Sequence, residues 1–301
     1  QNILEGDEYE AWKVIRGHIK FLSLRNYIRD SYNDHSYFMY MDNVKELELP
    51  KYGMTVNVEE KDDNGIMYFA NAHSLNKITI WSDVKGDAVD ITDDAVTDIP
   101  NKKLLNVVGQ YMFSNCYSLS TKYINRLIKD VTEIKDYAFK VDPDNRKHCP
   151  DEADNTIIEI PSTVTKIGSQ AFYNRVKVTG LNIQGNGGLE IGSEAFRGCD
   201  QLNALNLNNA KITSLGTGVF GDCRSMTNEF VNGVLSNYAT NGGKKIPAYL
   251  FFGCNGQEGH DGTDANKNQC YFTELNIPEQ FTEIGDGAFA SKNDAKIKLT
   301  T

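Results

Sequence analysis

One recurring segment constrains the fold of this chain more than any other feature. Residues Ile191–Leu207 read IGSEAFRGCDQLNALNL, and three segments of the same length carry apolar residues at matching positions: Val108–Ile124, Ile167–Ile183 and Leu215–Val231. Recurrence of this kind is typical of a solenoid, in which each repeat packs against its neighbours. The unit therefore predicts stacked coils, and it contains no recognisable catalytic motif.

The unit can be written I-G-x-x-A-F-x-x-C-x-x-L-x-x-L-x-L, and its parts predict different local structures. The alternating apolar residues of the tail predict a strand with one face inward. The spacing of three in A-F-x-x-C-x-x-L favours a short helix or 3₁₀ turn, and the glycine suits a tight corner. A V-T-x-I element predicts a second, shorter strand at Val131–Ile134, Val164–Ile167, Ile212–Leu215 and Phe281–Ile284.

The strand tails indicate about ten coils that form a mostly parallel sheet on one face. They are expected at Ile19–Leu24, Val44–Leu49, Leu75–Ile80, Leu119–Ile124, a weak tail ending at Ile160, Val178–Ile183, Leu202–Leu207, a weak tail near Met226–Val231, Phe272–Ile277 and Asp294–Leu299. Residues 1–17 are expected to form an N-terminal capping segment. Residues 18–301 form the solenoid, with degenerate repeats at 18–107 and regular repeats at 108–299. The predicted fold class is an α/β solenoid.

The composition disfavours several partner classes. The formal net charge is −10, so the surface should repel nucleic acid and anionic lipid. No apolar run approaches the roughly 20 residues of a membrane-spanning helix, and we expect no membrane insertion by this segment. A hydrophobic fraction of 40% suits a folded body with a substantial core.

The pattern LxxLxLPxxVTxIGxxAFxxCxxL resembles the BspA-like, or Treponema pallidum-type, leucine-rich repeat. The resemblance covers about residues 108–299 well and 19–107 loosely. It implies a leucine-rich-repeat solenoid that is secreted or displayed on the surface of a host-associated bacterium. It also implies a non-catalytic role in adhesion, with a protein or glycan partner that includes host matrix. A repeat fold serves many partners, so the resemblance names no ligand.

Four cysteines occupy the same repeat position: Cys116, Cys199, Cys223 and Cys254. Cysteine is small and tolerates burial, so we expect a column of free, buried thiols. They do not match a metal site, because the chain has no C-x-x-C pair. Cys149 and Cys270 lie in insertions, where a Cys254–Cys270 disulfide and separate loop thiols are both open.

The insertions at 140–155 and 254–270 are rich in turn formers and oxygen ligands. The second contains Asp261, Asp264, Asn266 and Asn268, whose spacing does not match an EF-hand loop. A solvated loop is favoured over a cation site, and both insertions are candidate partner contacts.

The sequence predicts no enzyme, no catalytic residue and no cofactor. None of the five histidines lies in an H-E-x-x-H motif, and the chain has no G-x-S-x-G elbow or glycine-rich phosphate loop. His148 and Cys149 are adjacent in a loop, where neighbouring side chains rarely point at each other. The carboxylates are numerous but scattered.

Alternate residues of the strand tails should project outward onto one continuous surface. Three of them are large aromatics of the kind that anchor interfaces: Phe21, Trp81 and Tyr123. Polar candidates on the same face are Asn182, Asn206 and Asn276. In the competing interpretation the aromatics pack under the acidic segment Asp83–Asp98, and the remaining face is simply solvated.

These observations favour a non-catalytic surface scaffold that recognises a protein or glycan partner through its sheet face and insertion loops. The alternative is a structural spacer that presents another domain and has no ligand of its own.

Overall fold

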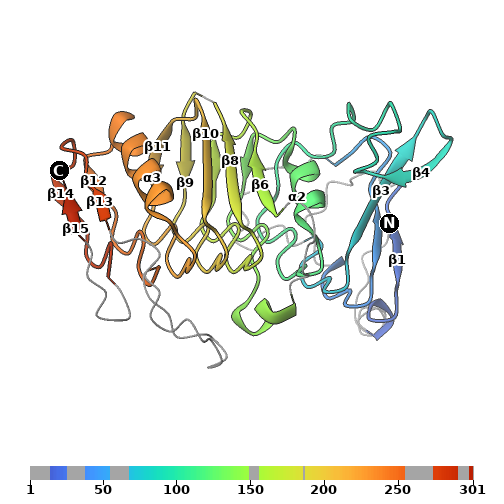
Figure 1. Ribbon diagram of the computed structural model, residues 1–301. Coiled ribbons are helices and arrows are strands. Elements are labelled where there is room, and N and C mark those ends of the chain that lie inside the picture. The colour runs from blue at the N-terminus through green and yellow to red at the C-terminus, as the bar shows by residue number, and fades with distance from the viewer. Residues whose placement is uncertain are drawn as a thin grey trace.

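Short strands stack into an elongated solenoid, with the N-terminal coils at one end and the C-terminal coils at the other (Figure 1). This computed structural model describes residues 14–25, 38–54, 68–148, 156–185, 187–254, 274–290 and 298–300. Residues 14–16 of the expected capping segment are helical, and residues 1–13 lie outside the described part. No described helix is long and apolar enough to cross a membrane.

The principal row of strands forms three separate sheets along one side of the coils. All neighbouring strands in this row are parallel, except that β3 and β4 form an antiparallel hairpin. The strands are β1 (Phe21–Ser23), β2 (Glu46–Glu48), β3 (Lys77–Ser82) and β4 (Asp87–Asp90), then β6 (Ile157–Ile160), β8 (Gly180–Gln184) and β10 (Ala204–Asn208), and finally β13 (Glu274–Asn276) and β15 (Lys298–Thr300).

A second row of shorter strands runs along another side, which confirms the prediction from the V-T-x-I element. Its strands are β5 (Glu133–Ile134), β7 (Lys166–Ile167), β9 (Leu189–Ile191) and β11 (Ile212–Leu215) in one sheet, with β12 (Lys245–Ile246) and β14 (Glu283–Ile284) in another. The isoleucines that end most of these strands point into the core: Ile134 and Ile167, for example, are completely buried.

The third side of the coils is held together by a stack of phenylalanine rings. Successive ring centroids lie between 5.2 and 6.2 Å apart, a spacing at which aromatic rings attract one another. The nine stacked residues are Phe38, Phe69, Phe113, Phe139, Phe172, Phe196, Phe220, Phe251 and Phe289. The last seven define about seven turns from Val108 onward, whereas the total of about ten coils stays a prediction.

The sequence predicts a short helix or a 3₁₀ turn around each phenylalanine, and the described coils form consecutive turns there and no α-helix. These turns are closed by bonds between residues three apart, such as the one from the N–H of Cys199 to the carbonyl of Phe196 over 3.2 Å. The N–H of Phe196 donates to the carbonyl of Val219 in the next coil, over 3.0 Å. In five of the described coils two residues of this segment adopt a positive φ, for example Glu194 at 56° and Gly198 at 74°. This left-handed backbone reverses the chain between turns and allows its N–H groups to bond the adjacent coil.

A glycine follows the first isoleucine or leucine of the repeat, as at Gly192 and Gly216, because two coils approach closely at this position. A Cβ atom on Gly192 would lie 2.6 Å from the backbone nitrogen of Ser169, and one on Gly216 would lie 2.4 Å from that of Ser193. No side chain fits at such distances without moving the neighbouring backbone. The predicted corner is therefore a contact between coils.

Two helices replace strands that the sequence pattern predicts. Helix α2 (Thr121–Ile128) stands where Leu119–Ile124 is expected to be extended, and helix α3 (Asn228–Thr240) replaces the weak tail near Met226–Val231. Both strand predictions are wrong. Thr227 accepts the N–H of Phe230 at the start of α3, a cap that favours the helix over a strand.

Side-chain amides on the helices bond the backbone of neighbouring strands. Asn125 on α2 donates to the carbonyl of Ile157 over 2.8 Å and accepts the N–H of Glu159 over 3.0 Å. On α3, Asn232 accepts the N–H of Asn276 over 2.9 Å. Each amide takes the place of a peptide group in an adjacent strand, so the interrupted sheet retains partners along these edges.

The cysteine position confirms the expected column of free, buried thiols. Cys199 donates to the carbonyl of Phe172 over 3.4 Å, and the other described cysteines bond a phenylalanine carbonyl in the same way. Arg175 occupies the same position in its coil. Its buried guanidinium donates to the carbonyls of Phe139, Leu119 and Cys116. A cysteine thiol and an arginine guanidinium at this repeat position therefore both donate to a phenylalanine carbonyl of a neighbouring coil.

Candidate functional site

The outward side of the principal strands is divided into three panels. Helix α2 separates β1–β4 from β6, β8 and β10, and α3 separates these from β13 and β15 (Figure 1). We refer to these strand groups as the N-terminal, central and C-terminal panels. The expected single continuous surface is therefore wrong, because each helix displaces one strand of the row.

Strand register aligns two outward rows across the N-terminal panel. Phe21, Glu46 and Lys77 form the first row, and Ser23, Glu48 and Thr79 form the second. Phe21 lies on the outermost strand of the panel and is 52% exposed. The ammonium of Lys77 lies 3.1 Å from the carboxylate of Glu46, so this carboxylate is paired.

A buried carboxylate fixes the position of an arginine in this panel. Glu48 is only 2% exposed, and its two oxygens accept from Ser23 Oγ and from Arg25 Nε, both over 2.5 Å. The Arg25 guanidinium also lies over the ring of Trp81, 4.3 Å from its centroid. A charge-assisted bond and a cation–π contact together restrict the guanidinium to one orientation.

Trp81 is half-buried and forms part of a charged cluster. Its indole N–H donates to Asp83 over 3.2 Å, and Lys51 lies 2.9 Å from the same carboxylate. The hydrogen bond between Lys51 and Asp83 is the main cause of two pKa shifts. It raises the pKa of Lys51 and lowers the pKa of Asp83. The pair stays ionised over the neutral pH range, and its surface exposure limits its energetic weight.

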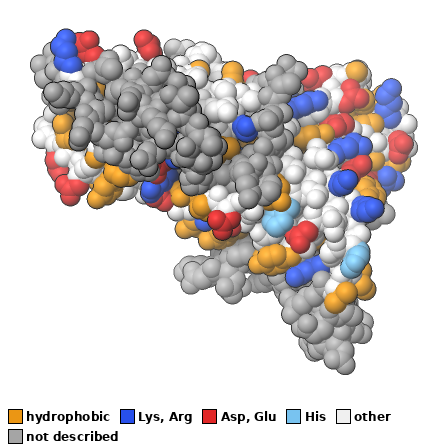
Figure 2. Space-filling model, turned by 60° about the horizontal axis from the view of Figure 1, so that its bottom comes forward, with side chains coloured by type: hydrophobic (Ala, Val, Ile, Leu, Met, Phe, Trp, Pro, Cys, Tyr) orange, Lys and Arg blue, Asp and Glu red, His pale blue; other side chains and the backbone are white. Residues whose placement is uncertain are grey.

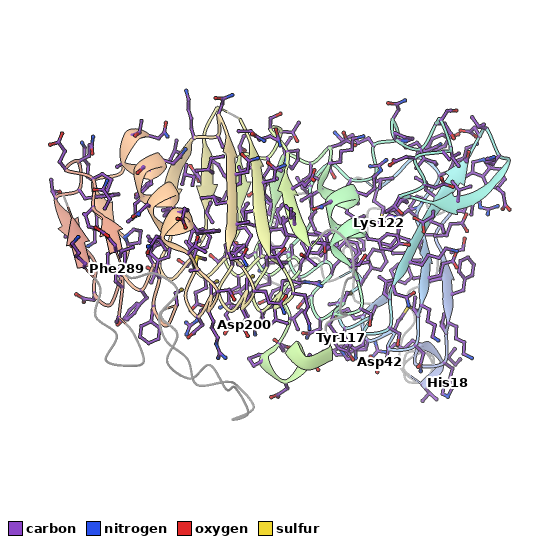
Figure 3. The ribbon with its side chains drawn as sticks, in the orientation of Figure 1. His18, Asp42, Tyr117, Lys122, Asp200 and Phe289 are labelled. Carbon is purple, nitrogen blue, oxygen red and sulfur yellow. The ribbon has the colours of Figure 1, made fainter. Side chains whose placement is uncertain are left out.

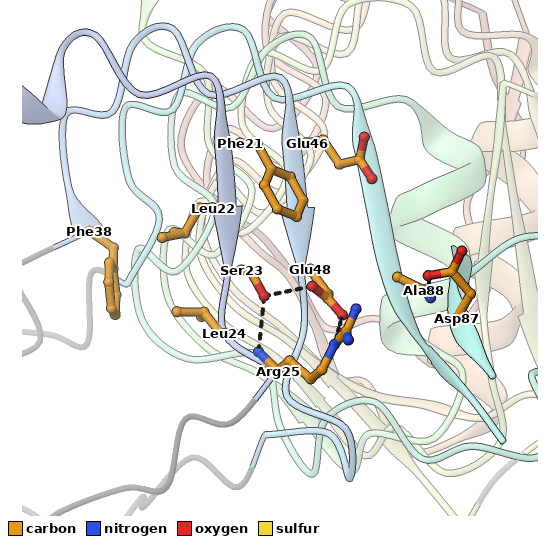
Figure 4. A pocket seen from close by; sticks show the side chains of 10 residues that line it. All are labelled: Phe21, Leu22, Ser23, Leu24, Arg25, Phe38, Glu46, Glu48, Asp87 and Ala88. Carbon is orange, nitrogen blue, oxygen red and sulfur yellow. Dashed lines mark hydrogen bonds and ion pairs between the residues drawn. The ribbon is translucent and has the colours of Figure 1, made fainter.

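A pocket of about 860 Å³ lies beside β1 and reaches across the N-terminal panel (Figure 4). The Ser23–Glu48–Arg25 group lies within it, and the ring of Phe21 borders it. The lining residues are Phe21, Leu22, Ser23, Leu24, Arg25, Phe38, Glu46, Glu48, Asp87 and Ala88. Its volume is in the range of small-molecule sites, and its walls combine apolar with charged groups.

Tyr123 is not on a strand, in contrast to the sequence prediction. It lies on α2, is 9% exposed, and donates its hydroxyl to Asp90 on β4 over 2.6 Å. Burial and the contact with Asp90 raise its pKa. Tyr123 therefore packs against the Asp83–Asp98 segment, as the competing interpretation expects, and it offers little surface to a partner.

The predicted asparagines are divided between the other two panels. Asn182 and Asn206 are neighbours on β8 and β10, and Asn182 Oδ1 accepts from Asn208 over 3.0 Å and from Gln184 over 3.2 Å. Asn276 is exposed on β13 in the C-terminal panel. The structure does not bring these residues together with Phe21 or Trp81.

The side of the turns carries an aromatic cluster that sequence reasoning missed. Tyr111 and Tyr137 stack with centroids 4.4 Å apart, and the Lys140 ammonium lies 5.5 Å from the Tyr137 ring and 5.7 Å from that of Tyr173. Both stacked tyrosines occupy the same repeat position, which the aligned repeats could have revealed. Elsewhere on this side, charged and apolar side chains are interspersed (Figure 2).

Histidine, cysteine and carboxylate groups do not gather into a metal site among the described residues. Figure 3 places Asp42, Tyr117 and Asp200 along the turns and Lys122 on α2. Asp42 contacts His73, which stacks on Tyr117 with centroids 5.0 Å apart. Cys149, Cys270 and the candidate cation ligands Asp261, Asp264, Asn266 and Asn268 lie outside the described residues.

Comparisons with known proteins identify a repeat family. The family model described as "BspA type Leucine rich repeat region" matches in six copies, over residues 34–143, 148–257 and 262–301. A leucine-rich cell surface protein from Faecalibacterium prausnitzii A2-165 is 16% identical, with a TM-score of 0.29 over 90% of this chain and 74% of that chain. A leucine-rich repeat protein from Bacteroides ovatus ATCC 8483 is 13% identical, with a TM-score of 0.26 over 93% of this chain and 92% of that chain. A comparison with curated proteins finds no significant match.

Proposed function

This chain belongs to the BspA type leucine-rich repeat family, and on that basis we propose that it is a non-catalytic binding scaffold on a bacterial cell surface. The partner is a protein or a glycan, host matrix included, and the N-terminal panel is its principal contact. No cofactor takes part. The repeat core supplies a rigid support, and recognition depends on the residues that differ from the repeat pattern.

The exposed ring of Phe21 carries this proposal. Phe21 is 52% exposed on a sheet face and is not part of the core, whose nearest members in the chain are Leu22 and Leu24. An exposed aromatic beside a pocket is the arrangement that dominates binding energy at many interfaces. The fixed guanidinium of Arg25 adds a directed hydrogen-bond donor at the same place.

A spacer role is the second candidate, and the uninterrupted stack of phenylalanine rings favours it. The stack continues past α3 through Phe220 and Phe251, whose centroids lie 5.7 Å apart. A scaffold whose core is continuous over its described length is suited to holding another domain at a fixed distance.

The test compares Phe21→Ala with Ile157→Ala in binding to host cells and to immobilised matrix proteins. Ile157 is 38% exposed on the central panel and provides a matched apolar truncation. We expect Phe21→Ala to weaken binding about tenfold or more, the effect of losing an interface anchor, and Ile157→Ala to leave it unchanged. Equal binding by the wild type and both variants would support the spacer role, and loss only in Ile157→Ala would move the site to the central panel.

A further inference from the structure

We propose that the pocket beside β1 binds a neutral oligosaccharide. This inference rests on the proposed function, because it names the ligand class of the N-terminal panel. Three properties of the pocket support it: an exposed aromatic ring, a set of directed hydrogen-bonding groups, and a near balance of paired charges.

The aromatic ring supplies a platform for a sugar ring. One face of a pyranose consists of C–H groups and is apolar, so it packs favourably against an aromatic side chain. Phe21 is exposed on the outward side of β1 and borders the pocket. The strand fixes the backbone of Phe21, so only its two side-chain torsions are ordered when a ligand packs on the ring.

The polar groups suit hydroxyls, each of which donates one hydrogen bond and accepts up to two. Arg25 uses Nε to bond Glu48 and its planar face to contact Trp81. Its terminal nitrogens Nη1 and Nη2 have no hydrogen-bond partner among the described residues, so they present donors in a fixed orientation. Glu46 and Asp87 also line the pocket and present carboxylate acceptors.

The charge distribution separates a neutral ligand from charged ones. Glu48 is paired with Arg25, and Glu46 is paired with Lys77. Asp87 lines the pocket without an ion pair in the described part of the chain, which leaves a small local excess of negative charge. A sulfated or sialylated glycan would be repelled by this excess and by the chain's net charge of −10. A cationic peptide would find two of the three pocket carboxylates, Glu46 and Glu48, already paired with Lys77 and Arg25, and only Asp87 left to bind it.

The experiment uses Trp81 as a reporter, because its ring contacts the Arg25 guanidinium that we expect to bind the ligand. The chain has two tryptophans, and Trp12→Phe isolates the Trp81 emission. The full chain is titrated with oligomers of glucose, galactose, mannose and N-acetylglucosamine, and separately with heparin and oligolysine. We expect at least one neutral oligomer to shift the Trp81 emission, with a Kd that changes less than twofold between low and high salt.

Two variants test the placement of the site. Phe21→Ala should weaken binding of that oligomer at least tenfold, and Arg25→Gln should weaken it comparably. Ile157→Ala on the central panel should bind as the wild type does. Far-ultraviolet circular dichroism and the melting temperature identify any variant that fails to fold. If one of Phe21→Ala and Arg25→Gln fails to fold, the oligosaccharide affinity of the other tests the placement of the site.

The inference is overturned if no neutral oligomer changes the emission, or if heparin or oligolysine binds instead with a strong salt dependence. If Phe21→Ala still weakens adhesion in that case, the binding function stands and its ligand is of another class. If Phe21→Ala changes neither adhesion nor oligosaccharide binding, the N-terminal panel is not the site and both proposals fail.

Discussion

The side-chain amide of Asn237 on α3 donates to the backbone carbonyl of Ala210 over 2.8 Å. The oxygen of the same amide accepts the N–H of Ile212, also over 2.8 Å. An adjacent strand would bond a peptide in this two-point manner. Asn125 does the same on α2. Asparagines on the two helices therefore bond the backbone of neighbouring strands in both rows, as an adjacent strand would.

Replacing Asn237 with alanine should lower the free energy of unfolding by about 1–3 kcal/mol, because it leaves a backbone N–H and a carbonyl without their partner. Urea denaturation followed by circular dichroism measures the change. The control is Asn208→Ala, which removes an exposed amide and should cost less than about 0.5 kcal/mol. Equal losses in the two variants would contradict the role assigned to Asn237.

Gly192→Ala should destabilise the chain by about 1–3 kcal/mol, because its Cβ would lie 2.6 Å from the backbone nitrogen of Ser169. Gly187→Ala is a matched control, since a Cβ at that position meets no atom within 4 Å. The control should be neutral or slightly stabilising, because alanine restricts the unfolded chain. Thermal unfolding of both variants checks this prediction, which fails if they melt at the same temperature.

Alkaline pH should destabilise the chain through its buried thiols. Burial raises the pKa of Cys116 from 9.0 to about 12. Below pH 9 the thiol is neutral in both states; above it, the unfolded thiol ionises and the folded one does not. The free energy of unfolding should therefore fall as pH rises from 9 toward 12, by up to about 1.4 kcal/mol per pH unit for this group.

The control variant is Cys116→Ala, which removes the thiol. Alanine is expected to fit, because Ala72 occupies the same repeat position in the neighbouring coil. Denaturation curves at pH 8, 9, 10 and 11 should show a shallower decline for this variant than for the wild type. Parallel declines would mean that the Cys116 thiol does not contribute.

Arg175→Met should be the most destabilising of these substitutions, by about 3 kcal/mol or more. The guanidinium donates to the carbonyls of Phe139, Leu119 and Cys116 at 2.8, 3.1 and 3.2 Å. The first of these carbonyls depends on it, because the N–H of Asp142 bonds Asn115 instead. Arg175→Lys keeps the charge but cannot reach all three acceptors, so an intermediate melting temperature is expected. A melting temperature for Arg175→Met equal to that of the wild type would exclude this bridging role.

The repeat pattern predicted those parts of the fold that depend on local spacing. The V-T-x-I strands and the buried cysteines follow from residues that recur in register, and both are found as predicted. The repeat pattern does not predict the helices, because the spacing of a strand tail also fits the two segments that form them. Their own periodicity was present in the sequence: Phe230, Val231, Val234 and Leu235 recur at helical spacing, and all are buried in α3.

The candidate site was less accessible to sequence reasoning. Phe21 was identified because it is a large residue at an outward strand position, and it lies at the border of the pocket. The repeat pattern does not predict that Arg25 and Glu48 form a pair. Their contact joins residues on different coils and depends on the register between β1 and β2, which a single repeat pattern does not encode.

The unbroken phenylalanine stack has a mechanical consequence. Contacts between coils are arranged in series, and each coil touches chiefly the coils before and after it. A pull along the axis therefore loads every ring-to-ring contact equally, and extension should proceed by peeling single coils from an end. Helices α2 and α3 interrupt the principal sheet but not the stack, so they would not act as fracture points under tension. A chain of this design lengthens in steps while the remaining coils keep their structure.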